Sequence, residues 1–200
     1  MIDFWDSRYN TDQFVYGKEP NRFFASELDG LPSGRILLPG EGEGRNAVYA
    51  ALQGWKVDAF DQSMIGYEKA LRFALESGVN INYQVCDLEN FTFKNFYYDV
   101  ICLIFFHLPP TERQLLHSRV VNSLQPGGIV ILEAFHKSQL EMGTGGPKVP
   151  EMLFDQATLL EDFRELSTLR IDQLQVTMDE GSIHQGNSSI IRYTGKKTKK

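Results

Sequence analysis

The sequence predicts an α/β fold in which a mostly parallel sheet carries helices on both faces. Apolar runs and segments with helical spacing alternate five times, and the long apolar run Tyr98–Phe106 lies near the middle of the chain. Such a run is typical of a central parallel strand that is covered on both faces, and the alternation places helices on both sides of the sheet. The chain then ends in two strand-like segments with no helix between them, which predicts an antiparallel hairpin and a mixed sheet.

Local patterns place the individual elements. Strands are expected at Ile36–Pro39, Lys56–Asp61, Asn80–Cys86, Tyr98–Phe106 and Ile129–Phe135, with hairpin strands at Leu169–Met178 and Ser188–Thr194. Helices are expected at Phe23–Leu28, Asn46–Gln53, Ser63–Gly78, from Pro110 to Leu124, and from Asp155 to near Leu166. Ser63 and Asp155 are candidate N-caps, and Gly54 follows its helix as a C-terminal glycine. Pro126-Gly127-Gly128 predicts a turn into the fifth strand.

Length and composition indicate one globular domain over residues 1–200. Hydrophobic residues make up 42% of the 200 residues, which is enough to bury a core. The formal net charge of −6 argues against a general nucleic-acid binder. The basic tail Lys196–Lys200 is expected to be a frayed, solvated end.

Cysteine usage and hydropathy indicate a cytoplasmic protein. Cys86 and Cys102 both lie in apolar runs, so we expect buried thiols in a reducing compartment, with no disulfide framework and no metal-ligand spacing. The N-terminus lacks the pattern of a signal peptide, and no apolar run approaches the ~20 residues of a membrane span. The sequence does not predict the oligomeric state.

Two segments outside the regular alternation are candidate covers of a site. Residues 1–30 are rich in aromatic residues, Tyr16 among them, and are expected either to form a flap over the domain or to attach an N-terminal helix to the sheet. Residues 136–155 form a long glycine- and proline-rich loop, and loops of that length are often functional. We expect them to line a substrate site.

A glycine-rich turn follows the first predicted strand, and a helix follows that turn. This order is typical of a Rossmann-type nucleotide site, in which a ligand approaches bare backbone. The glycines alternate with two acids in the series Gly40, Glu41, Gly42, Glu43 and Gly44. Carboxylates there would repel a pyrophosphate, which otherwise binds at such helix N-termini. The turn therefore favours a ligand that is cationic where it meets the glycines.

Two acids follow the next two predicted strands. Asp61 lies about 20 residues after the first glycine, the spacing at which an acid binds the hydroxyls of a ribose. Asp87 would accept a hydrogen bond from an exocyclic amine such as that of adenine, or it is a simple turn acid. The third glycine of a dinucleotide fingerprint would stand at the position of Arg45, which disfavours a nicotinamide dehydrogenase. An adenosine that carries a positive centre and no phosphate describes S-adenosylmethionine (SAM).

These features resemble the class I SAM-dependent methyltransferases, and within them the TehB-like (tellurite-resistance) and thiopurine methyltransferases. The motifs that carry the resemblance are Tyr16-Gly17-x-x-Pro20-Asn21, Gly40-x-Gly42-x-Gly44-Arg45-Asn46, Asp61, Cys86-Asp87-Leu88, His107-Leu108-Pro109 and Leu124-x-Pro126-Gly127-Gly128. The resemblance implies a Rossmann-like, doubly wound, seven-stranded sheet whose last strand is antiparallel. In such proteins an acid stands two places before the first glycine, whereas this chain has Leu38 there, and Glu41 or Glu43 is expected to replace it.

The resemblance also implies a set of cofactor contacts. Asp61 would bind the ribose, Asp87 and Leu88 the adenine, and the Ile104–Phe105 backbone would lie near the methionine part. The complete set expected to bind the cofactor is Tyr16, Gly40, Glu41, Gly42, Gly44, Arg45, Asn46, Asp61, Gln62, Asp87, Leu88, Ile104 and Phe105. No metal site is expected.

The predicted reaction is methyl transfer by in-line displacement to a small molecule, for which a thiol or chalcogen nucleophile needs little base catalysis. For an oxygen or nitrogen acceptor, His107 is the best-placed candidate base, or else it orients the following turn. His136 is a second candidate, whereas His117 and His184 are expected to be ordinary packing or surface residues. A protein or natural-product O- or N-methyltransferase and a non-catalytic SAM-binding module remain as alternatives.

Overall fold

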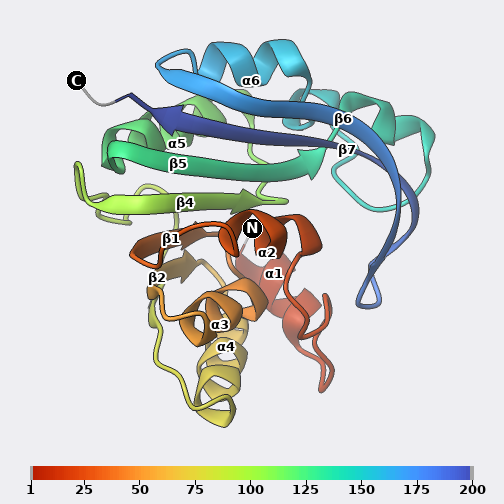
Figure 1. The fold of residues 1–200 in the computed structure, drawn as a ribbon. Helices are drawn as coiled ribbons and strands as arrows, with labels where there is room; N and C mark the ends of the chain where they lie inside the picture. The colour runs from red at the N-terminus through yellow and green to blue at the C-terminus, as the bar shows by residue number, and fades with distance from the viewer. Residues whose placement is uncertain (1, 199–200) are drawn as a thin grey trace. The chain divides into compact units, whose positions relative to one another are not determined.

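The computed structural model describes residues 2–198 and confirms the predicted fold (Figure 1). Its seven-stranded mixed sheet has the order β3-β2-β1-β4-β5-β7-β6. The strands are β1 Arg35–Pro39, β2 Lys56–Asp61, β3 Asn82–Val85, β4 Tyr98–Ile104, β5 Leu124–Phe135, β6 Leu166–Glu180 and β7 His184–Lys197. The α-helices are α1 Ile2–Tyr9, α2 Arg22–Leu28, α3 Arg45–Leu52, α4 Met64–Glu76, α5 Pro110–Ser123 and α6 Gln156–Asp162.

The described residues form two compact units. Unit 1 comprises the chain up to Thr92 together with Glu180–Ile183, and unit 2 comprises Phe93–Asp179 and the chain from His184. Unit 1 holds β1, β2 and β3, while unit 2 holds β4, β5, β7 and nearly all of β6.

In unit 1 the three strands are parallel and end at one edge. Pro39 of β1 lies opposite Phe60 of β2, and Asp61 lies opposite Val85 of β3. The glycine turn and the segments that follow β2 and β3 therefore meet at the carboxyl ends of the strands, where open α/β sheets bind ligands. The predicted caps are present: the Ser63 hydroxyl accepts from the Gly66 amide at 3.0 Å at the start of α4.

In unit 2, β4 and β5 are parallel and β5 pairs with β7 in the antiparallel direction. Buried apolar residues fill β4, in agreement with its predicted central place. Proline occupies the first turn of α5, where its missing N–H costs nothing. The Asp155 carboxylate caps α6 by accepting from the Thr158 amide at 2.7 Å, as predicted.

The structure corrects the predicted turn before β5, which begins at Leu124. Tyr98 of β4 lies opposite Leu124 and Val100 lies opposite Ile129, so the proline–glycine segment is a bulge within a strand. A Cβ on Gly128 would stand 3.0 Å from the Tyr98 carbonyl oxygen. Glycine thus allows the bulged chain to stay close to its neighbour.

The C-terminal expectations also need correction. The hairpin strands are longer than predicted and leave only residues 181–183 between them. Lys196 and Lys197 are part of β7 and not of a frayed end, whereas Lys199 and Lys200 lie outside the described residues. The Lys197 ammonium donates to the carbonyls of Val121 and Leu124 at 2.6 and 2.9 Å, because the last turn of α5 leaves such acceptors open.

The two candidate covers contain more regular structure than the sequence predicted. The N-terminal segment begins with helix α1, which was one of the two alternatives. Residues 136–155 contain two 3₁₀ helices, η1 Lys137–Glu141 and η2 Pro150–Met152. Across residues 2–198, no helix combines the length and the apolar character needed to cross a bilayer.

Candidate functional site

The glycine turn of unit 1 requires glycine at all three positions. Gly40, Gly42 and Gly44 have φ values of 63°, 60° and 87°, in the region that other residues rarely adopt. A Cβ on Gly42 would stand 2.5 Å from the hydroxyl of Tyr9, and one on Gly44 would stand 2.6 Å from the Cβ of Ala70. The turn is therefore fixed both by its own dihedral angles and by the side chains packed on it.

Glu41 caps the helix that follows the turn. One of its carboxylate oxygens accepts from the amides of Asn46 and Ala47, each at 2.8 Å. These amides belong to the first turn of α3, where a pyrophosphate binds in dinucleotide-binding proteins. Burial raises the pKa of Glu41 to about 7, against the lowering effect of the Ala47 amide and of Arg45. The chain thus places its own carboxyl group at this position.

Glu43 points to a different partner. Its carboxylate lies 2.5 Å from the ammonium of Lys69 on α4 and accepts from the Val15 amide at 2.7 Å. Lys69 also donates to the carbonyls of Tyr9, Thr11 and Gln13. Both charged side chains are buried. This pair fastens the N-terminal segment to the glycine turn, and the sequence analysis did not identify Lys69.

Asp61 lies at the end of β2, beside the turn. Its carboxylate accepts from the amides of Gly42 at 3.0 Å and Ser63 at 2.9 Å. Burial raises its pKa, and the backbone amides oppose that effect. Gln62 follows directly and is half-buried. The predicted ribose acid therefore stands next to the glycine turn, and it also orders the start of α4.

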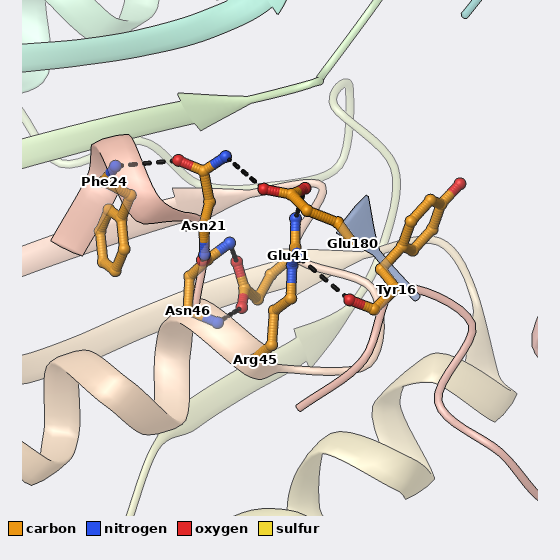
Figure 2. Close-up of polar contacts among 7 residues, drawn as sticks. All are labelled: Tyr16, Asn21, Phe24, Glu41, Arg45, Asn46 and Glu180. Atoms are coloured by element: carbon orange, nitrogen blue, oxygen red, sulfur yellow. Dashed lines mark hydrogen bonds and ion pairs between the residues drawn. The ribbon is translucent and has the colours of Figure 1, made fainter. Parts of the chain in front are cut away.

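Arg45 and Asn46, which were expected to bind cofactor, are joined to distant segments (Figure 2). Arg45 donates to the Tyr16 carbonyl at 3.1 Å and to the Glu180 carboxylate at 2.7 Å. The Asn46 side chain accepts from the Asn21 amide at 2.9 Å. Tyr16 therefore meets the glycine turn through its backbone, while its hydroxyl accepts from Arg8 at 3.2 Å. The prediction did not include Glu180, and Asn21 entered it only as the end of the Tyr16 motif.

Two buried tyrosines that the sequence analysis did not select enclose Gly42. The Tyr83 hydroxyl donates to the Gly42 carbonyl at 2.7 Å, and the Tyr9 hydroxyl occupies the side of Gly42 where a Cβ would stand. Burial, together with the negative charge of Asp61, raises the pKa of both tyrosines well above 10. Both hydroxyls are thus neutral at the carboxylate-rich turn, and that of Tyr83 donates to it.

The predicted adenine contacts follow β3. Asp87 is exposed, and one carboxylate oxygen accepts from the Asn90 amide at 2.9 Å and from the Asn90 side chain at 2.8 Å. Leu88 is buried. Asp87 thus has the local geometry of a turn acid, and its second carboxylate oxygen makes neither of these two bonds. Cys86 is half-buried and Cys102 is buried, and neither forms a disulfide.

Unit 2 carries the predicted methionine contacts at the end of β4. Ile104 is half-buried, and Phe105 has a φ of 51°, which is unusual for a residue with a side chain. Its ring lies 4.7 Å from the ring of Phe135 and 4.8 Å from that of His184, measured between centroids. Backbone strain of this kind is common at functional sites.

His107 is held by backbone groups on both sides of its ring. Its Nδ1 lies 2.8 Å from the Met152 carbonyl, and its Nε2 accepts from the Phe135 amide at 3.3 Å. This arrangement assigns the ring proton to Nδ1. Burial lowers the pKa of His107 to about 4. The imidazole is therefore neutral, and each nitrogen has a structural partner.

The remaining histidines have local roles in packing and capping. The Nδ1 of His136 accepts from the Ser138 amide at 3.1 Å and caps η1. His117 is buried and binds the Asp162 carboxylate at 2.8 Å, and burial lowers its pKa. His184 packs edge-on against Phe105 and Phe135. Among the residues that the structure describes, no group of three potential metal ligands occurs.

The loop 136–155 packs on the same aromatic cluster. A Cβ on Gly146 would stand 2.9 Å from the ring of Phe135, so the chain passes close over that ring. Gln139 anchors the loop, because its side-chain carbonyl accepts from the Ser189 amide at 2.7 Å. The loop is therefore fixed to β7, next to the aromatic residues.

Comparison with known proteins agrees with this geometry. A model of the family described as "Methyltransferase domain" matches residues 36–128, which include the glycine turn, Asp61 and the His107 segment. Residues 36–128 are thus similar to methyltransferase domains, and the Rossmann-like fold is the one found in solved methyltransferases. The predicted resemblance to the class I SAM-dependent methyltransferases is thus confirmed.

Proteins that are similar to this chain include a curated enzyme and two solved structures. The ubiquinone biosynthesis O-methyltransferase of Rickettsia canadensis (strain McKiel) is 33% identical over 103 residues, which are 51% of this chain and 43% of that protein. TehB from Haemophilus influenzae has a TM-score of 0.74 at 17% identity, covering 98% of this chain and 67% of that one. The chain spans less than half of the length of the curated relative.

The N-methyltransferase NodS from Bradyrhizobium japonicum WM9 was solved in complex with S-adenosyl-l-homocysteine (SAH). It has a TM-score of 0.72 at 12% identity and covers 98% of this chain and 97% of its own. The predicted cofactor, SAM, agrees with the match to the methyltransferase-domain family.

Proposed function

We propose that this protein transfers the methyl group of SAM to a small molecule whose nucleophilic atom is anionic, or nearly so, before it reacts. The observation that carries the proposal is the Glu41 carboxylate on the first amides of α3. This carboxylate takes the place of a pyrophosphate, so the turn suits an adenosine that carries a positive centre. The methyltransferase domain match supports the same cofactor.

Asp61 binds the ribose in this proposal. Its carboxylate already accepts from Gly42 and Ser63, but an ionised carboxylate has about four lone-pair positions. The ribose hydroxyls add to these bonds, and the backbone amides keep the carboxylate in place. Asp87 and Leu88, after β3, then meet the adenine, the first as an acceptor and the second as an apolar contact.

The reaction is an in-line displacement. A lone pair of the acceptor forms the bond to the methyl carbon while the carbon–sulfur bond breaks, and its electron pair neutralises the sulfonium. The products are the methylated acceptor and SAH. The protein contributes orientation and exclusion of water, for which the apolar rings of Phe105 and Phe135 are suited.

His107 is an orienting residue in this proposal and not the general base. Both of its ring nitrogens have backbone partners, and the low pKa keeps the ring neutral. Without an identified base, the acceptor must lose its proton before the displacement. A thiol, with an ordinary pKa of about 8.5, meets this condition, and so does an acidic phenol. The phenol has the additional support of the relative named as an O-methyltransferase.

Titration calorimetry with SAM and SAH tests the cofactor, and a methyl-release screen over thiols, chalcogen oxyanions and phenols tests the acceptor. We expect micromolar binding of SAM, and a loss of about 100-fold in Asp61→Ala because both ribose hydrogen bonds to a charged group disappear. Asp58→Ala on the same strand is the matched control, since Asp58 accepts from Asn82 at an exposed position.

Unchanged affinity in Asp61→Ala would contradict the ribose assignment. SAM binding with no methyl release from any acceptor would favour a non-catalytic SAM-binding module. Transfer only to a protein or a larger natural product would replace the small-molecule acceptor by one of those classes.

A further inference from the structure

The tip of the β6–β7 hairpin belongs to unit 1 although its strands belong to unit 2. The chain enters unit 1 at Glu180 and leaves it after Ile183. Glu180 stands next to Arg45 and Asn21 in Figure 2, so its carboxylate is shared between α3 and the N-terminal segment. The function proposed above gives no role to this contact.

The Glu180 ion pair is largely removed from solvent. One carboxylate oxygen lies 2.7 Å from Arg45, and the side chains of Arg45 and Glu180 are only 9% and 15% exposed. The other oxygen accepts from the Asn21 side chain at 3.0 Å. Because water is excluded from this pair, removal of one charge is expected to have a large effect on the other.

The position of Arg45 makes that effect important for a cationic ligand. Arg45 is the first residue of α3, where the helix already carries a partial positive charge. The neighbouring Glu43 is neutralised by Lys69 and cannot also compensate Arg45. Glu180 is the carboxylate that the structure places on the Arg45 guanidinium.

The hairpin tip also fixes the N-terminal segment mechanically. The Ser182 amide donates to the Val15 carbonyl at 2.9 Å. A Cβ on Gly181 would stand 2.1 Å from that carbonyl oxygen and 2.5 Å from the Tyr16 Cα. The tip therefore lies directly against the backbone of residues 15 and 16, whose second anchor is the bond from Arg45 to the Tyr16 carbonyl.

We propose that Glu180 is a cofactor-positioning residue that neutralises Arg45 beside the glycine turn and holds residues 15–21 against it. This inference rests on the proposed function, because it concerns the binding of a cofactor with a sulfonium. The inference predicts an effect of charge: loss of Glu180 removes the carboxylate that contacts Arg45, so the positive charge near the turn increases and SAM binding is weakened more than SAH binding. SAH has the same shape without the methyl group and the sulfonium charge.

The test compares the dissociation constants of SAM and SAH, measured by calorimetry, in the wild type and in Glu180→Gln. Glutamine keeps the size of the side chain and an acceptor for Asn21 while it removes the charge. We expect SAM to bind about tenfold more weakly and SAH about threefold more weakly. The larger effect on SAM comes from the partly buried charge of Arg45, which is no longer offset in Glu180→Gln. Asp179→Asn removes a charge from the same hairpin at an exposed residue and should change neither constant.

A second pair of variants tests the contact with residues 15 and 16. Gly181→Ala introduces a methyl group against this backbone, and we expect weaker binding of both ligands. Gly78→Ala has a comparable dihedral strain, since φ is 70° at Gly78 and 63° at Gly181, but its Cβ would meet no atom within 4 Å. Wild-type affinity in Gly181→Ala would overturn the positioning role.

The outcomes of the charge test separate the two proposals. Equal losses of affinity for SAM and SAH in Glu180→Gln, or a loss below twofold for SAM, would overturn the inference.

If the wild type binds neither ligand, the proposed function fails. Hydrogen exchange of the Val15 and Ser182 amides then tests the hairpin contact by itself. Faster exchange in Glu180→Gln than in Asp179→Asn would support the contact, and equal exchange would contradict it. Circular dichroism and thermal unfolding verify that each variant is folded.

Discussion

The candidate site residues of the two units differ in chemistry. In unit 1 the glycine turn is surrounded by carboxylates, each of which has a defined partner: Glu41 binds helix amides, Glu43 binds Lys69, and Asp61 binds Gly42 and Ser63. In unit 2 the corresponding segment after β4 consists of aromatic rings and a neutral imidazole. The first region is ordered by charge and hydrogen bonds, and the second by packing.

Under the proposed function, this difference corresponds to two separate demands of methyl transfer from a sulfonium. Recognition of a cationic nucleoside needs fixed acceptors, and these are most effective when they are held before the ligand arrives. Displacement at the methyl carbon needs orientation and a dry environment, which rings provide without ionisable groups. Four experiments, ordered by expected effect, test whether charge dominates one region and packing the other.

The largest effect is expected for Lys69→Met. The substitution leaves Glu43 buried without its cation and removes the three hydrogen bonds that Lys69 donates to carbonyls of the N-terminal segment. The free energy of unfolding should therefore fall by about 4 kcal/mol. Urea denaturation measures it. Lys18→Met is the control, since the Lys18–Glu76 pair is exposed and its loss should cost less than about 1 kcal/mol. A cost below about 1 kcal/mol for Lys69→Met as well would mean that charge pairing does not order this region.

The next effect concerns Glu41 and pH. Burial raises its pKa from 4.5 to about 7, so the folded state holds the proton more tightly than the unfolded state. The tighter proton binding contributes to the free energy of unfolding. This contribution is present in full below pH 4.5 and is lost as the pH rises through 7, by at most about 3 kcal/mol. Glu41→Gln should remove this decline, as measured by chemical denaturation between pH 4.5 and 8. Glu68→Gln, on the exposed side of α4, should retain it.

His107 should show the opposite pH dependence. Burial lowers its pKa from 6.5 to about 4, so stability is present above pH 6.5 and is lost as the pH falls through 4, again by at most about 3 kcal/mol. His107→Gln should reduce this acid-side loss, because the neutral amide replaces the imidazole. If the free energy of unfolding falls equally steeply with decreasing pH in the variant and in the wild type, other groups cause the acid sensitivity of unit 2.

The smallest effect is expected for Tyr83→Phe. It removes one hydrogen bond to the Gly42 carbonyl and leaves the ring in place, so the free energy of unfolding should fall by about 1 kcal/mol. Tyr67→Phe is the comparison, because it removes a hydroxyl from the neighbouring ring that packs edge-on against Tyr83. If both variants match the wild type, the hydroxyl of Tyr83 does not contribute to the order of the glycine turn.

Much of the fold could be predicted because its signals are local and periodic. Alternating strands and helices, the glycines after β1 and the acid after β2 each occupy a few consecutive residues. The errors occurred where pairing with a distant strand overrides a local pattern. Pro126-Gly127-Gly128 has the composition of a turn, yet its neighbour Tyr98 keeps it within a bulged strand. Lys197 has the composition of a frayed tail, yet acceptors at the end of α5 hold it.

By itself, the sequence determined the class of fold, the resemblance to methyltransferases and the residues that follow each strand, because chain order and periodicity place these residues at the carboxyl ends of parallel strands. Only the tertiary structure decided which partner each charged side chain takes. Arg45 and Glu180 are 135 residues apart, and Glu43 and Val15 are 28 residues apart. Such pairs depend on which surfaces become buried together, and burial is a property of the folded chain that no local pattern encodes.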